Sequence, residues 1–250
     1  MLRWLAPHLS GVPLDAIDAD KLRAITTAKL AEGVTAHTVN AYLALVRAVL
    51  RSAHQWGWIA QVPKVTMLKR PPSPGRRITP ERAAQLLQLL PPHSRDMALF
   101  ALETGLRRSN VTGLQWDWID WRERMVHIPA SEAKGRRPIS APLSAQAMRI
   151  LRRWRGQHPS HVFHYLGRPI TQTNTRAFRR AREQANLGRY RWHDLRHTWA
   201  SWHVESGTPL PALQVLGGWS TPSMVSLYSH LQAANLRPWV QRTRRVRLAH

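Results

Sequence analysis

A basic, proline-rich stretch in the first third of the chain limits how the rest can fold. The segment KRPPSPGRRITP, residues 69–80, holds four prolines, one glycine and four basic residues in twelve positions. Proline fixes φ and lacks a backbone N–H, so this stretch favours an extended linker over a helix or a central strand. We therefore predict two domains, at residues 1–68 and 79–250, joined by a basic linker over residues 69–78 that can lie along a phosphate backbone.

The part before the linker is predicted to be helical. In TAHTVNAYLALVRAVLRSAHQWGW, apolar side chains recur with a period of roughly 3.6 residues opposite a polar face. Thr35 is in position to cap this helix and Gly57 to end it. A shorter helix is predicted to start after Asp18 and to run through Leu30.

The part after the linker mixes helices with one hairpin. A capped helix is expected after Thr79, and the next helix is expected to end at Gly105. MVHIPA and RRPISAPLS are short β-like runs separated by SEAKG, which predicts an antiparallel β-hairpin. Helices are also predicted in SAQAMRILRRWRG, TQTNTRAFRRAREQAN and RWHDLRHTWAS. The predicted fold class is mainly α with a small antiparallel β-sheet.

The charge of the chain bears on its partner. Lys plus Arg total 37 against 14 Asp plus Glu, which gives a net charge of +23. Such an excess attracts polyanions, and nucleic acid is the first candidate. Basic residues occur in almost every segment, so the folded body itself is expected to be basic. A ribosomal-type or non-specifically basic protein is the alternative.

Neither a membrane span nor a secretion signal is predicted. The chain has no run of about 18 apolar residues, and its start, MLRWLAPHLSG, lacks the long apolar core of a signal peptide. It contains no cysteine. Disulfides and thiolate metal ligands are therefore excluded, which fits a reducing compartment. We expect a cytoplasmic location and no membrane partner.

The segment RWHDLRHTWAS, residues 191–201, concentrates titratable groups in one helical stretch. His193 and His197 lie four residues apart, which is the spacing of two zinc ligands on one helix face. Against zinc, Arg196 would direct a cation at the metal, and the surroundings offer no obvious third ligand.

A helical wheel separates this stretch into two faces. Leu195, Trp199 and Trp202 fall on one face, which we expect to be core. The two histidines and Arg196 fall on a neighbouring face. Taken alone, that second face is most simply a solvated surface.

Two further segments carry candidate chemistry. In ETGLRRSN, residues 103–110, Arg107 lies where a new helix begins, and a guanidinium there can join backbone N–H groups in holding an anion. In LGGWSTPSMVSLYSHL, residues 216–231, Trp219 precedes Tyr228. Each has an ordinary alternative, a surface arginine in the first case and packed aromatic rings in the second.

Taken in this order, these segments resemble the tyrosine recombinase, or phage integrase, family. TGLRRSN resembles the box of its first arginine, KGRRP its hairpin-lysine segment, HDLRHTWAS its histidine–arginine box, and LGGWSTPSMVSLYSHL its nucleophile box, over residues 76–235. Through AHTVNAYL and HQWGWI, residues 1–68 resemble its helical, SAM-like core-binding domain. The resemblance implies a core-binding domain followed by an α+β catalytic domain.

The resemblance also implies an activity and a set of residues. Members of the family are site-specific DNA recombinases that cut and rejoin DNA strands through a 3′-phosphotyrosyl intermediate, without metal, ATP or another cofactor. The matching catalytic residues are Arg107, Lys134, His193, Arg196, Trp219 and Tyr228. In these roles Tyr228 is the nucleophile, His193 the base, and Lys134 the acid that protonates the leaving 5′-oxygen. The arginines and Trp219 stabilise the phosphate, and His197 is expected to be support or packing.

The partners implied by the resemblance are double-stranded DNA, a homo-tetramer on two DNA sites, and accessory DNA-bending or directionality proteins. The basic end segment RPWVQRTRRVRLAH is expected to contact DNA or a neighbouring subunit.

The sequence departs from the family pattern at two places. Asn110 lies three residues after Arg107, where the family usually has an acid, and asparagine cannot balance the arginine's charge. The chain also begins late for a complete core-binding domain. Both departures keep open a DNA-binding remnant with impaired catalysis. A metal-dependent nuclease or transposase would need convergent carboxylates, whereas the acidic cluster of Asp15, Asp18 and Asp20 fits a helix start.

Overall fold

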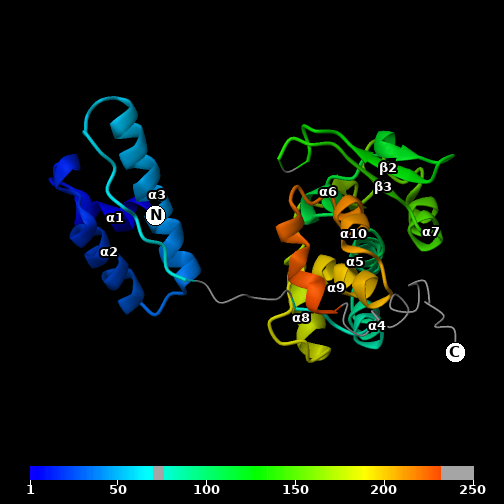
Figure 1. Ribbon diagram of the computed structural model, residues 1–250. Helices are drawn as coiled ribbons and strands as arrows, with labels where there is room; N and C mark the ends of the chain where they lie inside the picture. Colours follow the sequence, from blue (N-terminus) through cyan, green and yellow to red (C-terminus); the bar gives the residue numbers. More distant parts are fainter. Residues whose placement is uncertain (70–75, 134, 232–250) are drawn as a thin grey trace, which may run out of the picture. The chain divides into compact units, whose positions relative to one another are not determined.

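The computed structural model describes residues 1–69, 76–133 and 135–231 (Figure 1). The chain divides into two compact units, Met1–Ser73 and Pro74–His250, and each has its own hydrophobic cluster. Lys134, part of the predicted linker and the basic end segment lie outside the described residues. Within the described ranges, none of the helices has the length and apolar character needed to cross a membrane.

The N-terminal unit is a small bundle of α1 (Leu2–Leu9), η1 (Leu14–Ala16), α2 (Ala19–Ala31) and α3 (Ala36–Gln55), where η denotes a 3-10 helix. The two helices predicted here are confirmed. Asp18 caps α2 by accepting a hydrogen bond from the backbone N–H of Lys21 at 2.8 Å. Thr35 likewise caps α3, and Gly57 follows that helix with a φ of +75°. Helix α1 was not predicted from the sequence as a separate helix.

A buried lysine fastens α1 to the rest of this unit. Lys29 is only 5% exposed. Its ammonium lies 4.3 Å from the ring centre of Trp4 and 4.4 Å from that of Tyr42. The carboxylate of Glu32 accepts from it at 2.7 Å and also accepts from the Trp4 indole. A buried ammonium requires such partners, so the cluster joins the three helices at one point.

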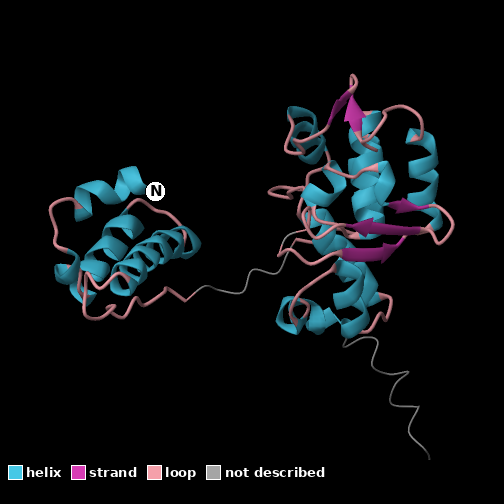
Figure 2. Ribbon diagram, turned by 90° about the horizontal axis from the view of Figure 1, so that it is seen from above, coloured by secondary structure: helices cyan, strands magenta, loops and turns pink. Residues whose placement is uncertain are grey.

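The C-terminal unit is helical with two small antiparallel sheets (Figure 2). Its elements are α4 (Pro80–Gln88), α5 (Pro92–Thr104), α6 (Arg108–Thr112), η2 (Trp116–Trp118), β1 (Ile119–Asp120), β2 (Met125–Ile128), β3 (Ile139–Pro142), α7 (Ala145–Trp154), β4 (His164–Tyr165), β5 (Arg168–Pro169), α8 (Arg176–Gln184), α9 (Asp194–Glu205), α10 (Leu210–Gly217), η3 (Pro222–Met224) and η4 (Ser226–Leu231). The predicted fold class, mainly α with a small antiparallel sheet, is confirmed.

The predicted hairpin is β2 paired with β3, with Val126 opposite Ala141. Strand β1 adds a third strand to this sheet, which the sequence analysis did not anticipate. The prediction for α8 was too long at its start. Thr175 provides the N-cap by accepting from the backbone N–H of Phe178, so the helix begins at Arg176 and not in the preceding TQTN.

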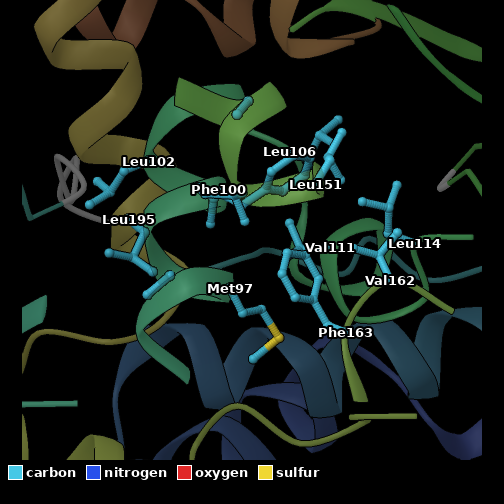
Figure 3. Close-up of a cluster of buried hydrophobic side chains, with 14 of the residues drawn as sticks. Met97, Phe100, Leu102, Leu106, Val111, Leu114, Leu151, Val162, Phe163 and Leu195 are labelled. Atoms are coloured by element: carbon cyan, nitrogen blue, oxygen red, sulfur yellow. The ribbon is translucent and has the colours of Figure 1, made fainter. Parts of the chain in front are cut away.

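Helix α5 lies at the centre of the C-terminal core and packs against both α7 and α9. Figure 3 shows Met97 and Phe100 of α5 among buried side chains from other elements, including Leu195 of α9. The rings of Phe100 and Phe163 meet edge to face with their centres 5.5 Å apart. This core fixes α9, the helix that carries most of the candidate site.

A buried carboxylate joins α5 to α7. Asp96 is 5% exposed. It accepts two hydrogen bonds from one nitrogen of Arg153, at 2.8 and 3.0 Å, and one from the Trp154 indole at 2.9 Å. The Arg153 side chain is 61% exposed. The hydrogen bond from the Trp154 indole to Asp96 is therefore buried, whereas the ion pair with Arg153 is partly exposed to solvent.

We predict that Asp96→Ala lowers the free energy of unfolding by about 2–4 kcal/mol, because it leaves the buried indole N–H of Trp154 without an acceptor. Urea denaturation measures the loss. In the control, Arg153→Ala, water replaces an exposed partner and the loss stays below about 1 kcal/mol. Equal losses in the two variants would contradict this assignment.

Candidate active site

Helix α9 presents the two faces that the sequence predicted, but the second face is not simply solvated. Leu195 and Trp199 are buried, and Trp202 is partly buried against the main core. Arg196 is also buried, with only 4% of its surface exposed. A solvated surface is therefore the wrong interpretation for Arg196.

The start of α9 is held by an ion pair outside the site. The buried carboxylate of Asp194, in the first turn, accepts from the backbone N–H of Arg191 at 2.8 Å and from its side chain at 3.1 Å. Asp194 is thus paired with Arg191, and the next turn of α9 carries Arg196 and His197, whose partners lie on other elements.

Arg196 is fixed by the ends of two other helices. One terminal nitrogen donates to the carbonyl of Gly105, just after α5, at 2.5 Å, and the other donates to the carbonyl of Gly217, at the end of α10, at 2.6 Å. The last carbonyls of a helix lack partners within the helix and carry partial negative charge. The indole of Trp219 covers the guanidinium, whose central carbon lies 4.0 Å from the ring centre. Arg196 therefore joins three helices and keeps a defined orientation.

A second guanidinium lies close to the first. Arg107 precedes α6, and one of its nitrogens donates to the carbonyl of Gly218 at 3.1 Å. Its other terminal nitrogen is buried and has no hydrogen-bond partner among the described residues. Burial lowers the pKa of Arg107 and lowers that of Arg196 to about 9, with the charge of Arg107 adding to the second effect.

No carboxylate in the described ranges forms an ion pair with either arginine. A buried cation, Arg196, beside a half-buried one, Arg107, is unfavourable without a counter-ion, because each has lost part of its hydration. An anion bound between them would remove that penalty. Guanidinium groups donate paired hydrogen bonds to phosphate and carboxylate oxygens, so the two arginines are candidate ligands for such an anion.

Glycines make the close packing of this site sterically possible. Gly105 has a φ of +61°, and a Cβ there would lie 2.1 Å from the ring of Trp199. A Cβ on Gly217 would lie 1.9 Å from the ring of Trp219. The two indoles stack with their centres 6.0 Å apart. Both glycine carbonyls can reach Arg196 only because no side chain separates them from these rings.

Tyr228 lies in η4 and is 4% exposed. Its hydroxyl forms a hydrogen bond with Nδ1 of His197 at 2.5 Å, and its ring centre is 6.0 Å from that of Trp219. Burial raises the pKa of Tyr228 to about 12, while the charge of Arg196 acts in the opposite direction. The structure thus brings the tyrosine, the tryptophan and Arg196 together.

The contact between His197 and Tyr228 was not predicted from the sequence. His197 was expected to be support or packing, yet it holds the tyrosine hydroxyl. The helical wheel gave the one indication of a role for His197, because it placed this residue on the same face as Arg196 and His193. The wheel could not show that η4 packs against this face.

His193 lies at the edge of the same cluster. Its side chain is exposed, and its ring stands perpendicular to that of His197 with the centres 5.1 Å apart. Although His193 is exposed to solvent on one side, the packed groups around its ring reduce its hydration, and this desolvation, followed by the charges of His197 and Arg196, lowers the pKa of His193. The described residues show no hydrogen bond between His193 and Tyr228, and they contain no group of three or more His, Cys, Asp or Glu that could hold a metal ion.

Asn110 is buried and bonds away from Arg107. Its amide nitrogen donates to the carbonyl of Glu132 at 3.2 Å, and its side-chain oxygen has no partner in the described part of the chain. Glu132 belongs to the loop between β2 and β3, two residues before Lys134 in the sequence. Asn110 therefore anchors the loop that leads to the predicted lysine.

Comparisons with known proteins agree with this geometry. The sequence model of the phage integrase family matches residues 76–235. The integrase of Salmonella phage P22 is 33% identical over 216 residues, which is 80% of this chain and 55% of that protein. The chain thus spans about half the length of this relative. It belongs to the phage integrase family, as the sequence motifs predicted.

Solved structures share the fold. The integrase of the Tn1549 transposon, in complex with circular intermediate DNA, superposes with a TM-score of 0.75 at 20% identity, covering 96% of this chain and 90% of that one. A lambda integrase tetramer bound to a Holliday junction gives a TM-score of 0.74 at 19% identity, covering 92% of this chain and 70% of that one.

We predict that Gly105→Ala lowers the free energy of unfolding by about 2–5 kcal/mol, because a methyl group there collides with Trp199 and strains the left-handed backbone. Denaturant titration measures this loss. Gly156→Ala is the matched control, since Gly156 has a φ of +80° with nothing within 4 Å of its Cβ position. The control retains the backbone strain alone, about 1 kcal/mol. A loss of the same size in both variants would show that the Trp199 contact is unimportant.

Proposed function

We propose that this chain is a site-specific DNA recombinase that cuts and rejoins DNA strands through a 3′-phosphotyrosyl link on Tyr228. One observation carries the proposal: the buried guanidinium of Arg196 and the half-buried guanidinium of Arg107 lie close to a tyrosine hydroxyl, and neither has a carboxylate partner among the described residues. Family membership supports the same conclusion.

The chemistry that fits these residues is the transfer of a phosphodiester to tyrosine. The oxygen of Tyr228 attacks the phosphorus, the bond to the 5′-oxygen breaks, and the bond energy is kept in the phosphotyrosyl link. Negative charge develops on the non-bridging oxygens, where the two arginines can donate paired hydrogen bonds. Because Arg196 is already held by two helix ends, it needs little reorganisation when the charge develops.

Two further residues, Trp219 and Lys134, keep the roles implied by the family resemblance. Trp219 covers Arg196 and limits the access of water to the phosphate. Lys134 protonates the leaving 5′-oxygen. The resemblance also implies His193 as the base for Tyr228, a role that no hydrogen bond among the described residues supports. No metal, ATP or other cofactor takes part in this proposal.

We further propose double-stranded DNA as the substrate and a homo-tetramer on two DNA sites as the active assembly. The net charge of +23 supports a polyanionic partner. The structurally similar lambda integrase was solved as a tetramer on a Holliday junction, which supports the assembly by analogy. Accessory DNA-bending or directionality proteins, and action on DNA in the cytoplasm, belong to the same proposal. The unit Met1–Ser73 is proposed as the core-binding domain and Pro74–His250 as the catalytic domain.

A nicked suicide DNA substrate tests the activity. We expect the wild-type chain to form an SDS-resistant protein–DNA adduct, and Tyr228→Phe to bind the same DNA without forming it, because only the hydroxyl oxygen is lost. The adduct should persist in EDTA. Adduct formation that EDTA abolishes would indicate a metal-dependent nuclease, and DNA binding without an adduct would indicate an impaired remnant.

We predict that Arg107→Ala lowers the rate of adduct formation by about 10²- to 10³-fold, the usual effect of losing one preorganised donor. DNA affinity, measured by fluorescence anisotropy, changes by a few-fold only, since the donor acts mainly on the developing charge. The control is Arg108→Ala, which removes an exposed neighbouring cation. If Arg107→Ala forms the adduct as fast as this control, the proposed role of Arg107 is wrong.

A further inference from the structure

We propose that His197, and not His193, accepts the phenolic proton of Tyr228 as its oxygen attacks the phosphate; this inference rests on the function proposed above. The assignment starts from a contact between the two side chains. Nδ1 of His197 lies 2.5 Å from the tyrosine oxygen, which is a short hydrogen bond between candidate base and nucleophile. Among the described residues, no such bond links His193 to Tyr228.

The packing of α9 against η4 holds His197 beside Tyr228. His197 directly follows Arg196 on α9, and α9 packs against η4, the element that carries Tyr228. One helix turn therefore holds both a phosphate-binding guanidinium and the imidazole beside the nucleophile. The orientation of the base is coupled to that of Arg196, which two helix ends fix.

The surroundings of His197 favour the neutral imidazole that a base requires. Burial lowers its pKa, the charges of Arg196 and Arg191 act in the same direction, and only Asp194 opposes them. Nδ1 can then accept a hydrogen bond from the tyrosine hydroxyl. The phenol needs this acceptor because burial raises the pKa of Tyr228 to about 12.

The other ionisable side chains on the elements around His197 contact it directly, have partners elsewhere or are exposed. His193 faces it across the ring contact, and Tyr228 faces it from η4. Helix α10 carries no ionisable side chain. Three ionisable side chains of α5 have partners elsewhere: Arg95 with backbone carbonyls, Asp96 with Arg153 and Trp154, and Glu103 with Ser144. His93, at the start of α5, contacts Tyr165. His230 is exposed on η4.

The proposed step is balanced in atoms and charge. The bond between the Tyr228 oxygen and phosphorus forms, the bond between phosphorus and the 5′-oxygen breaks, and the phenolic proton moves to Nδ1 of His197. The leaving 5′-oxygen takes a separate proton, for which Lys134 is the proposed donor. When the 5′-hydroxyl of a partner strand attacks, the imidazolium of His197 returns its proton to the tyrosine.

The first test compares two asparagine variants by the rate of adduct formation on the suicide substrate. In His197→Asn, the side-chain oxygen can take the place of Nδ1 and keep the hydrogen bond, but it cannot take up the proton. We expect a loss of about 10²-fold or more at neutral pH. His193→Asn, the matched control, loses much less. A rate close to wild type in His197→Asn would overturn the proposal.

The pH dependence provides a second measurement that does not need the His197 variant to fold. In the wild type, the rate rises with pH as the imidazole loses its proton, and the midpoint lies below the ordinary histidine pKa of about 6.5, as burial directs. We expect His193→Asn to keep this rise of the rate with pH, the acid limb of the profile. The midpoint of the rise can move, because the two imidazoles interact. Loss of the limb in His193→Asn would assign the base to His193 and overturn our inference.

Two chemical substitutions separate the base from the acid. A fluorinated tyrosine of lower pKa at position 228 should restore much of the rate lost in His197→Asn, because the phenol then ionises more easily. A substrate with sulfur in place of the 5′-bridging oxygen should rescue Lys134→Ala but not His197→Asn, because a thiolate leaves without a proton. Rescue of His197→Asn by the sulfur substrate alone would make His197 the acid and refute the assignment.

These outcomes also separate this inference from the proposed function. If the wild type binds DNA and never forms an adduct, the recombinase proposal itself fails. If the wild type forms the adduct and His197→Asn matches it, only the role of His197 fails.

Discussion

The guanidinium of Arg196 is the group on which the candidate site depends. It bonds to the carbonyls of Gly105 and Gly217, so one side chain joins the ends of α5 and α10 to α9. A cation at helix C-termini is stabilised by the partial charge of the free carbonyls. The same bonds remove its freedom to rotate. Structural anchoring and readiness to receive an anion are therefore properties of one set of contacts.

This arrangement has an energetic consequence for the folded state. Arg107 and Arg196 lie near each other with reduced hydration, and the described residues give neither a carboxylate partner. The free protein holds this strain because the hydrophobic core around α5 and α9 fixes the backbone on both sides. An anion bound between the two arginines would relieve this strain.

The neighbouring aromatic groups complete the site in a compact volume. Trp219 covers Arg196, Trp199 stacks on Trp219, and Tyr228 lies beside them with its hydroxyl held by His197. Gly105 and Gly217 are required because any Cβ would collide with these rings. Tyr228, the proposed nucleophile, is therefore buried and has a defined hydrogen-bond partner, and its environment sets both its orientation and its pKa.

The sequence alone determined the fold class, the helix starts at Asp18, Thr35 and Thr79, and the hairpin, because capping residues and hydrophobic period act locally. Its motifs also led to the family and to Tyr228. Only the tertiary structure decided the contact of His197 with Tyr228. That contact joins side chains 31 positions apart, and no local pattern specifies which face of α9 meets η4. The same holds for Arg196, whose burial follows from the meeting of three helix segments in space.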